Sequence, residues 1–122
     1  MVAVRAGAHP DFDRFVIQFD KAVPAYEARP QPTASFMLDP SGQSVTLQGR
    51  AGVSIKLRGT SGQGTFNGPS DLRPAFVELR EARLLGDFER VVTWGLGLTR
   101  PACLRTFSLD APPRLVVDVR AV

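Results

Sequence analysis

Thirteen consecutive residues, 45–57, alternate between two kinds of side chain, and this alternation constrains the fold more than any other stretch. Every odd position from Val45 to Leu57 is apolar or glycine, whereas the even positions are polar, charged or glycine. Successive side chains of a β-strand point to opposite faces, so the pattern predicts strand with one face on a core and the other in water. Gly49 and Gly52 mark a bend or bulge that splits the run into two strands.

The rest of the chain also indicates short strands separated by turns. Ten Pro and eleven Gly are spread along 122 residues, which favours an all-β domain over a helical one. Prolines interrupt the extended segment around Tyr26, which is therefore expected to be an edge strand or a connection. The apolar run that ends at Val119 is expected to be a central strand buried on both sides. Further strands are predicted at 2–6, 15–19, 35–38, 90–98 and 103–109.

Residues 70–85 allow two interpretations. Ser70 could cap a helix whose apolar residues share one side, and local propensity favours this helix. Pro74 argues against it, because proline breaks a helix interior. We predict a short helical turn at 70–74 and a strand over 76–84.

A short motif occurs twice, as Asp-Phe-Asp-Arg at 11–14 and as Asp-Phe-Glu-Arg at 87–90. Each copy lies between two β-rich segments, as the turn of a β-hairpin does. We therefore predict one domain over residues 1–122, an antiparallel β-sandwich of about seven to nine strands. It contains internally duplicated hairpins and at most one short helical turn.

Charge and cysteine content restrict the function classes. The net charge is +3, with thirteen Arg and two Lys, but the arginines alternate with acidic neighbours and form no continuous positive stripe for a nucleic acid. Cys103 is the only cysteine, so no internal disulfide is expected. No apolar run reaches the ~18 residues of a membrane span. The chain starts directly in a strand pattern, which suggests that the natural N-terminus, with any signal segment, lies upstream of Met1.

No residue set is typical of catalysis. Cys103 and His9 are the only thiol and imidazole, and a packing role for the first and a turn role for the second are favoured over a catalytic pair. The acidic residues of both repeats could hold calcium or act as paired carboxylates if they met, but capped turns and surface ion pairs are the favoured interpretation. We expect no catalytic residue, no metal and no cofactor.

Five residues are candidates for ligand binding. Tyr26 and Trp94 could stack on a sugar ring or anchor a partner, although core packing is the favoured alternative for Trp94. Arg100, Arg105 and Arg114 could meet the anionic groups of a ligand. A solvated strand face is the alternative for these arginines.

Several segments resemble a known family. The ending Pro-Pro-Arg-Leu-Val-Val-Asp-Val at 112–119 resembles the terminal strand of AMIN domains, β-sandwich modules of bacterial envelope proteins. The segment Gly-Asp-Phe-Glu-Arg-Val-Val-Thr-Trp-Gly-Leu-Gly-Leu at 86–98, the opening Val-Arg-Ala-Gly and Pro-Ala-Tyr at 24–26 resemble the AMIN-like domain of actinobacterial envelope lipoproteins. The resemblance runs nearly end to end, and the part from 86 to 119 is the most specific.

The resemblance implies an extracytoplasmic domain, secreted or lipid-anchored, and it transfers no catalytic residue. We expect a non-catalytic envelope binding or localisation module that engages peptidoglycan, another wall polymer or an envelope protein. The alternative is a structural protein–protein interaction domain of a larger envelope protein, binding by exposed strand edges. Contact with a membrane is expected only through an N-terminal lipid anchor that this chain does not contain.

Overall fold

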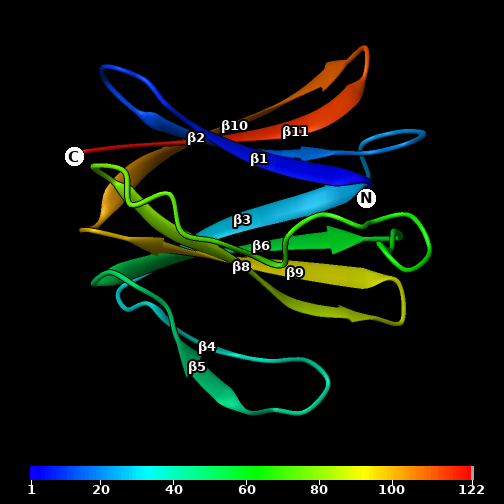
Figure 1. The fold of residues 1–122 in the computed structure, drawn as a ribbon, viewed down its shortest axis with the longest axis horizontal. Coiled ribbons are helices and arrows are strands. Elements are labelled where there is room, and N and C mark those ends of the chain that lie inside the picture. Colours follow the sequence, from blue (N-terminus) through cyan, green and yellow to red (C-terminus); the bar gives the residue numbers. More distant parts are fainter. Residues whose placement is uncertain (122) are drawn as a thin grey trace.

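Two antiparallel β-sheets pack face to face, and a separate β-hairpin lies against the outer side of one of them (Figure 1). The computed structural model describes residues 1–121, which form eleven strands and no helix. Sheet A has the order β1-β2-β11-β10 and sheet B the order β3-β6-β9-β8-β7, with β4 and β5 as the hairpin. The strands are β1 (Ala3–Ala8), β2 (Asp13–Gln18), β3 (Ala25–Gln31), β4 (Ser35–Met37), β5 (Ser44–Thr46), β6 (Ala51–Arg58), β7 (Asp71–Leu72), β8 (Leu79–Phe88), β9 (Val91–Leu98), β10 (Ala102–Asp110) and β11 (Pro113–Ala121).

The predicted all-β antiparallel sandwich is confirmed, but with more strands than the seven to nine expected. The extended segment around Tyr26 is the edge strand β3, and β7 occupies part of the segment expected to be helical. A strand of two residues, such as β7, is too short to show the side-chain alternation from which a strand is predicted.

The division of the alternating run 45–57 into two strands is confirmed. Its first part belongs to β5 and its second part is β6, with Gly49 between them at φ +116°. A Cβ atom at Gly49 would lie 2.2 Å from the carbonyl oxygen of Leu98. The chain therefore passes so close to β9 that only glycine fits at this bend.

The predicted helical turn at 70–74 is wrong. Asp71 and Leu72 form β7, which pairs with β8, and the Leu84 N–H donates to the Ser70 carbonyl at 2.7 Å. The following strand was expected over 76–84 but runs from Leu79 to Phe88. Pairing with the long strand β8 supplies hydrogen-bond partners for the backbone of this segment. A short helix before a proline could not supply them.

Both Asp-Phe motifs lie in hairpins, as predicted, but their turns are not equivalent. In β1–β2 the loop comprises residues 9–12, and Asp13 already belongs to the strand. In β8–β9 the turn is Glu89 and Arg90, with φ of 51° and 60°. The two hairpins also lie in different sheets. The predicted duplication of one bend is therefore wrong, because similar residues occupy different turn positions.

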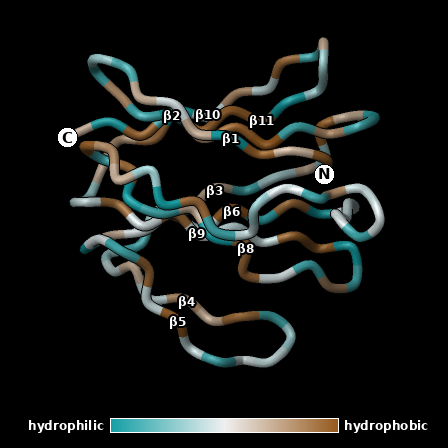
Figure 2. The backbone as a smooth tube through the Cα atoms, viewed as in Figure 1, coloured by the Kyte–Doolittle hydropathy of each residue, from teal (hydrophilic) through white to brown (hydrophobic). Residues whose placement is uncertain are grey.

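One apolar core lies between the sheets, and both sheets contribute side chains to it. Hydrophobic residues occur along strands of both sheets (Figure 2). The inward-facing residues are at most 1% exposed and include Phe15, Ile17, Leu115, Val117 and Val119 of sheet A and Val53, Ile55, Leu57, Val92, Trp94, Leu96 and Leu98 of sheet B. The prediction that the last strand is central and buried on both sides is confirmed, since β11 lies between β2 and β10 with five consecutive buried residues.

The β4–β5 hairpin rests on a patch of outer sheet B that lacks side chains. A Cβ atom at Gly95 would come within 2.8 Å of Leu85 and 3.3 Å of Phe36, and one at Gly97 within 2.1 Å of the Gln48 carbonyl oxygen. The hairpin side chains pack on this patch as a second, smaller apolar cluster. The hairpin therefore covers part of outer sheet B, whereas outer sheet A carries no such layer.

Candidate functional site

The outer surface of sheet A is rich in arginine. Phe15 and Ile17 of β2 point into the core, so their neighbours Arg14 and Val16 point outward, because strand side chains alternate. The pairing registers place the other outward-facing residues in rows across the sheet. The arginines of this surface, here called the arginine face, are Arg5 of β1, Arg14 of β2, Arg105 of β10, and Arg114 and Arg120 of β11.

Two phenylalanines and two arginines form a stacked ladder on this face, with Phe12 from the β1–β2 loop, Arg14 from β2, and Phe107 and Arg105 from β10. The Arg14 guanidinium carbon lies 5.3 Å from the ring centre of Phe12 and 5.5 Å from that of Phe107. Arg105 lies over Phe107 as well, at 4.9 Å. These are cation–π distances. The ladder, Phe12–Arg14–Phe107–Arg105, holds the two long arginine side chains in fixed positions.

Asp118 of β11 anchors the ladder. Its Oδ1 accepts a hydrogen bond from Arg14 Nε at 2.8 Å and its Oδ2 accepts one from Arg14 Nη2 at 3.0 Å. This two-point hydrogen bond raises the pKa of Arg14, which stays cationic. Asp118 is 6% exposed. It is the one carboxylate among the outward residues of the four strands within the described chain, so it neutralises Arg14 and leaves the face positive.

Two valines lie beneath these side chains. Val16 and Val116 are direct partners across β2 and β11, and both are buried although they point outward. Arg5 lies opposite Val16, and Phe107 lies opposite Val116. Arginine stems and aromatic rings can cover apolar surface while guanidinium groups remain in water. The face is therefore packed, with its charges presented outward.

A pocket of about 300 Å³ opens at one end of the arginine face. It is lined by Asp11, Phe12, Cys103, Leu104, Arg105, Asp118 and Arg120. Within residues 1–121, Arg105 and Arg120 form no ion pair. Unpaired guanidinium groups beside an aromatic ring are suited to bind a carboxylate or phosphate group.

The sequence-predicted residues are divided between this face and other parts of the molecule. Arg105 and Arg114 lie on the arginine face. Tyr26 lies on the edge strand β3 of sheet B and is 37% exposed. Trp94 is 0% exposed, its ring lies 5.3 Å from that of Phe15, and its Nε1 donates to Met1 Sδ at 3.1 Å. Trp94 therefore packs in the core, which is the alternative that the sequence favoured, because its side chain points inward from β9.

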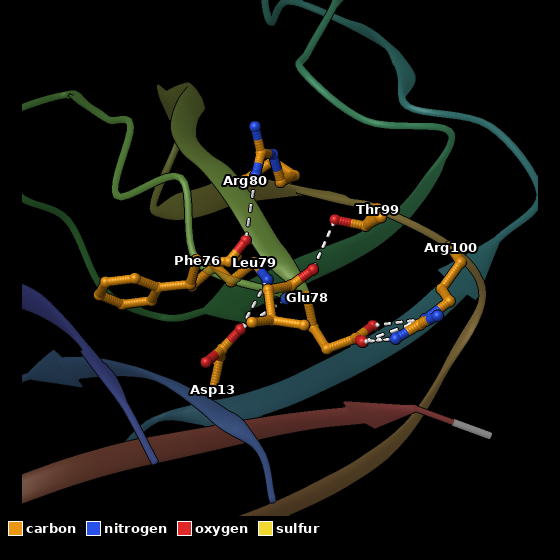
Figure 3. Close-up of polar contacts among 8 residues, drawn as sticks. Asp13, Phe76, Glu78, Leu79, Arg80, Thr99 and Arg100 are labelled. Atoms are coloured by element: carbon orange, nitrogen blue, oxygen red, sulfur yellow. Dashed lines mark hydrogen bonds and ion pairs between the residues drawn. The ribbon is translucent and has the colours of Figure 1, made fainter. Parts of the chain in front are cut away.

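Arg100 is held in a joint between the sheets (Figure 3). Its Nε donates to Glu78 Oε1 at 3.1 Å and its Nη2 to the same oxygen at 2.5 Å. Asp13 of β2 accepts hydrogen bonds at Oδ2 from the Glu78 and Leu79 backbone N–H groups, at 2.8 and 3.0 Å. Asp13 thereby ties sheet A to the start of β8, and the nearby Arg100 has its charge compensated. The contacts of this cluster therefore serve to connect the two sheets.

Of the residues considered for chemistry, Asp11 and Cys103 line one pocket, whereas His9 and Asp13 line another. Asp87 accepts from Ser61 Oγ and Gly62 N, far along the chain from the partners of Asp13. His9 stacks on Phe12 and lines a different pocket from Cys103. Residues 1–121 contain no group of three or more His, Cys, Asp or Glu side chains placed to hold a metal ion. The same residues include no helix long and apolar enough to cross a membrane.

Sequence reasoning missed most of the arginine face. Arg5, Arg14 and Arg120, together with Phe12 and Phe107, were not candidates, because β1 and β2 are far in sequence from the β10–β11 hairpin. Each arginine alternates with a core residue of its strand. Alternation could have shown that these arginines point outward, but not that three of the strands are neighbours.

Comparisons with known proteins give one result. The model of the AMIN-like domain matches residues 1–121. A search of curated proteins and a search of solved structures find no match.

Proposed function

Because the chain belongs to the AMIN-like domain family, we propose that it binds an anionic polymer of the cell wall through the arginine face, with peptidoglycan as the first candidate. Membership of the family indicates a non-catalytic domain associated with the cell envelope, outside the cytoplasm. The observation that carries the proposal is the grouping of five arginines on one sheet face with a single opposing carboxylate, Asp118.

The face has two properties that favour a polymer. Arginines recur on all four strands, and adjacent strands are about 4.8 Å apart, so several anionic groups of one chain can be contacted together. Exposed ionic contacts are weak one by one, but simultaneous contacts to linked groups raise the overall affinity. The stacked ladder also orders Arg14 and Arg105 before binding, which reduces the entropy lost on association.

Cosedimentation with purified, protein-free sacculi tests the proposal. We expect Arg105→Gln combined with Arg120→Gln to lower the bound fraction about tenfold, since charge-assisted hydrogen bonds are lost. The matched control is Arg58→Gln combined with Arg83→Gln, which removes the same charge from outer sheet B. Equal retention of both double variants, or no retention of the wild type, contradicts the proposal.

The second candidate is a protein-interaction domain that pairs by a strand edge. β10 has nine residues and lies at the edge of sheet A, and β3 lies at the edge of sheet B. Exposed edges of this kind can accept another strand. Cosedimentation with protein-free sacculi distinguishes the two candidate functions, because a domain that binds only protein strand edges would not be retained on them.

A further inference from the structure

The pocket at the end of the arginine face combines three kinds of surface. Arg105 and Cys103 project outward from β10, and their direct partners on β11 are Asp118 and Arg120. Arg105 and Arg120 are therefore diagonal neighbours, at about 7–8 Å in an antiparallel pair. Long side chains at that spacing can converge on one anionic group. The pocket thus has a cationic side formed by two guanidinium groups.

Carboxylates line the same pocket. Asp118 is occupied by Arg14, and Asp11 comes from the β1–β2 loop. No hydrogen bond among residues 1–121 uses the Asp11 carboxylate, which is exposed. A carboxylate accepts hydrogen bonds and repels anions, so it favours a ligand that carries an N–H donor near its negative group. Phe12 contributes an apolar surface to the pocket.

We propose that this pocket binds the free α-carboxylate end of a short peptide. Arg105 and Arg120 hold the terminal carboxylate, Asp11 accepts the last amide N–H, and a small terminal side chain lies against Phe12. A phosphodiester chain has no N–H group for Asp11 and meets its negative charge. The inference rests on the proposed wall function and narrows it to the peptide part of the polymer. The C-terminus of a protein chain carries the same free α-carboxylate and last amide N–H.

Cys103 provides a direct measure of occupancy. It is the only cysteine of the chain, it is exposed, and it lines the pocket. A bound peptide should shield the thiol from an alkylating reagent. At a peptide concentration of about twice its Kd, about one third of the pockets stay empty, so the alkylation rate should fall about threefold.

The probes are N-acetyl-Ala-Ala with a free carboxylate, the same dipeptide as its C-terminal amide, and inorganic phosphate. We expect protection by the free acid only. Equal protection by the amide overturns carboxylate recognition, and equal protection by phosphate shows a general anion site and overturns the peptide assignment. The D-configured and L-configured free acids distinguish a wall peptide from a protein tail.

Variants assign the effect to the pocket. Arg120→Gln should abolish protection, whereas Arg58→Gln, on outer sheet B and outside the pocket lining, should retain it. The alkylation rates of Cys103 with and without peptide are compared as a ratio within each variant, because Arg120 also affects the reactivity of the thiol. Sacculus retention is measured in parallel. Retention without thiol protection overturns this inference alone, and loss of both overturns the proposed function as well.

Discussion

Arg14 has three partners at once, two aromatic rings and a nearly buried carboxylate. Replacing it by alanine would leave Asp118 in its low-exposure position without its ion-pair partner. We expect Arg14→Ala to lower the free energy of unfolding by about 3 kcal/mol, since an unpaired buried charge is costly. Chemical denaturation measures the loss.

Arg14→Lys is the matched control. Lysine keeps the positive charge but lacks the planar fork that contacts both oxygens of Asp118, so it should recover only part of the stability. If Arg14→Ala unfolds at the same denaturant concentration as the wild type, the stability of the fold does not depend on the Arg14–Asp118 ion pair.

Asp13 accepts two hydrogen bonds from buried backbone N–H groups at the start of β8. In Asp13→Ala the Glu78 and Leu79 N–H groups lose their acceptor, and we expect a loss of about 2–4 kcal/mol in unfolding free energy. Asp13→Asn keeps an acceptor oxygen and should recover most of that loss. The same low stability in both variants would show that charge, rather than hydrogen bonding, makes the joint.

At the scale of the element, β8 is linked to the β4–β5 hairpin and to β7 through Glu81. Its Oε1 accepts the Gln48 N–H at 2.8 Å, and Arg73 Nε lies 3.7 Å from its Oε2. The pKa of Glu81 lies above its ordinary value of 4.5, first because burial disfavours the charged form and then because of the Asp71 carboxyl group. Asp71 Oδ1 is buried and has no hydrogen-bond partner within residues 1–121.

An acid whose pKa is raised by folding weakens the fold as pH rises through the folded pKa, because the unfolded chain releases that proton more readily. Glu81→Gln should remove this penalty and supply an amide donor for Asp71. We expect a gain of about 1 kcal/mol at neutral pH, which shrinks as pH falls and vanishes below the unfolded value of 4.5. Thermal unfolding across this pH range measures it.

Glu27→Gln is the control of opposite sign. The hydrogen bond from Arg29 lowers the pKa of the exposed Glu27, so this variant gains nothing at neutral pH. A Glu81→Gln variant that is less stable than the wild type at neutral pH would mean that the charge of Glu81 is needed by Gln48 or Arg73.

Gly97 lies where the hairpin crosses β9. A Cβ atom there would be 2.1 Å from the Gln48 carbonyl oxygen and 3.0 Å from Leu47 Cβ, so Gly97→Ala should displace the hairpin and cost about 1–3 kcal/mol. Gly7→Ala is the matched control, since its nearest neighbour is 3.9 Å away. It should change stability by less than about 0.5 kcal/mol. Denaturation curves of the two variants that coincide would contradict the close contact.

The elements differ in how far sequence alone could predict them. The period of two in β6 and the apolar run of β11 report burial directly, so both were predictable. The strand β7 was not, because its two residues take their conformation from pairing with β8. The two Asp-Phe turns also depend on context, since Glu89 and Arg90 adopt positive φ in a two-residue turn and their counterparts do not.

For the whole molecule, the two outer faces differ. Sheet B carries the hairpin on its glycine patch, and sheet A presents arginines over Val16 and Val116. Arg105 and Arg114 could be proposed from sequence, but placing Arg14 beside them required the pairing of β2 with β11, which are distant in the chain. For Trp94 the sequence left both roles open, because nothing in the sequence of an apolar strand shows whether an aromatic side chain in it is exposed.

The most direct test of the account maps backbone amide chemical shifts while soluble wall fragments are added. The account predicts that the changes concentrate on β2, β11 and β10, around Arg14, Arg105 and Arg120, and diminish as added salt screens the charges. Changes confined to sheet B and the β4–β5 hairpin would contradict it, as would a spectrum that stays unchanged at millimolar fragment.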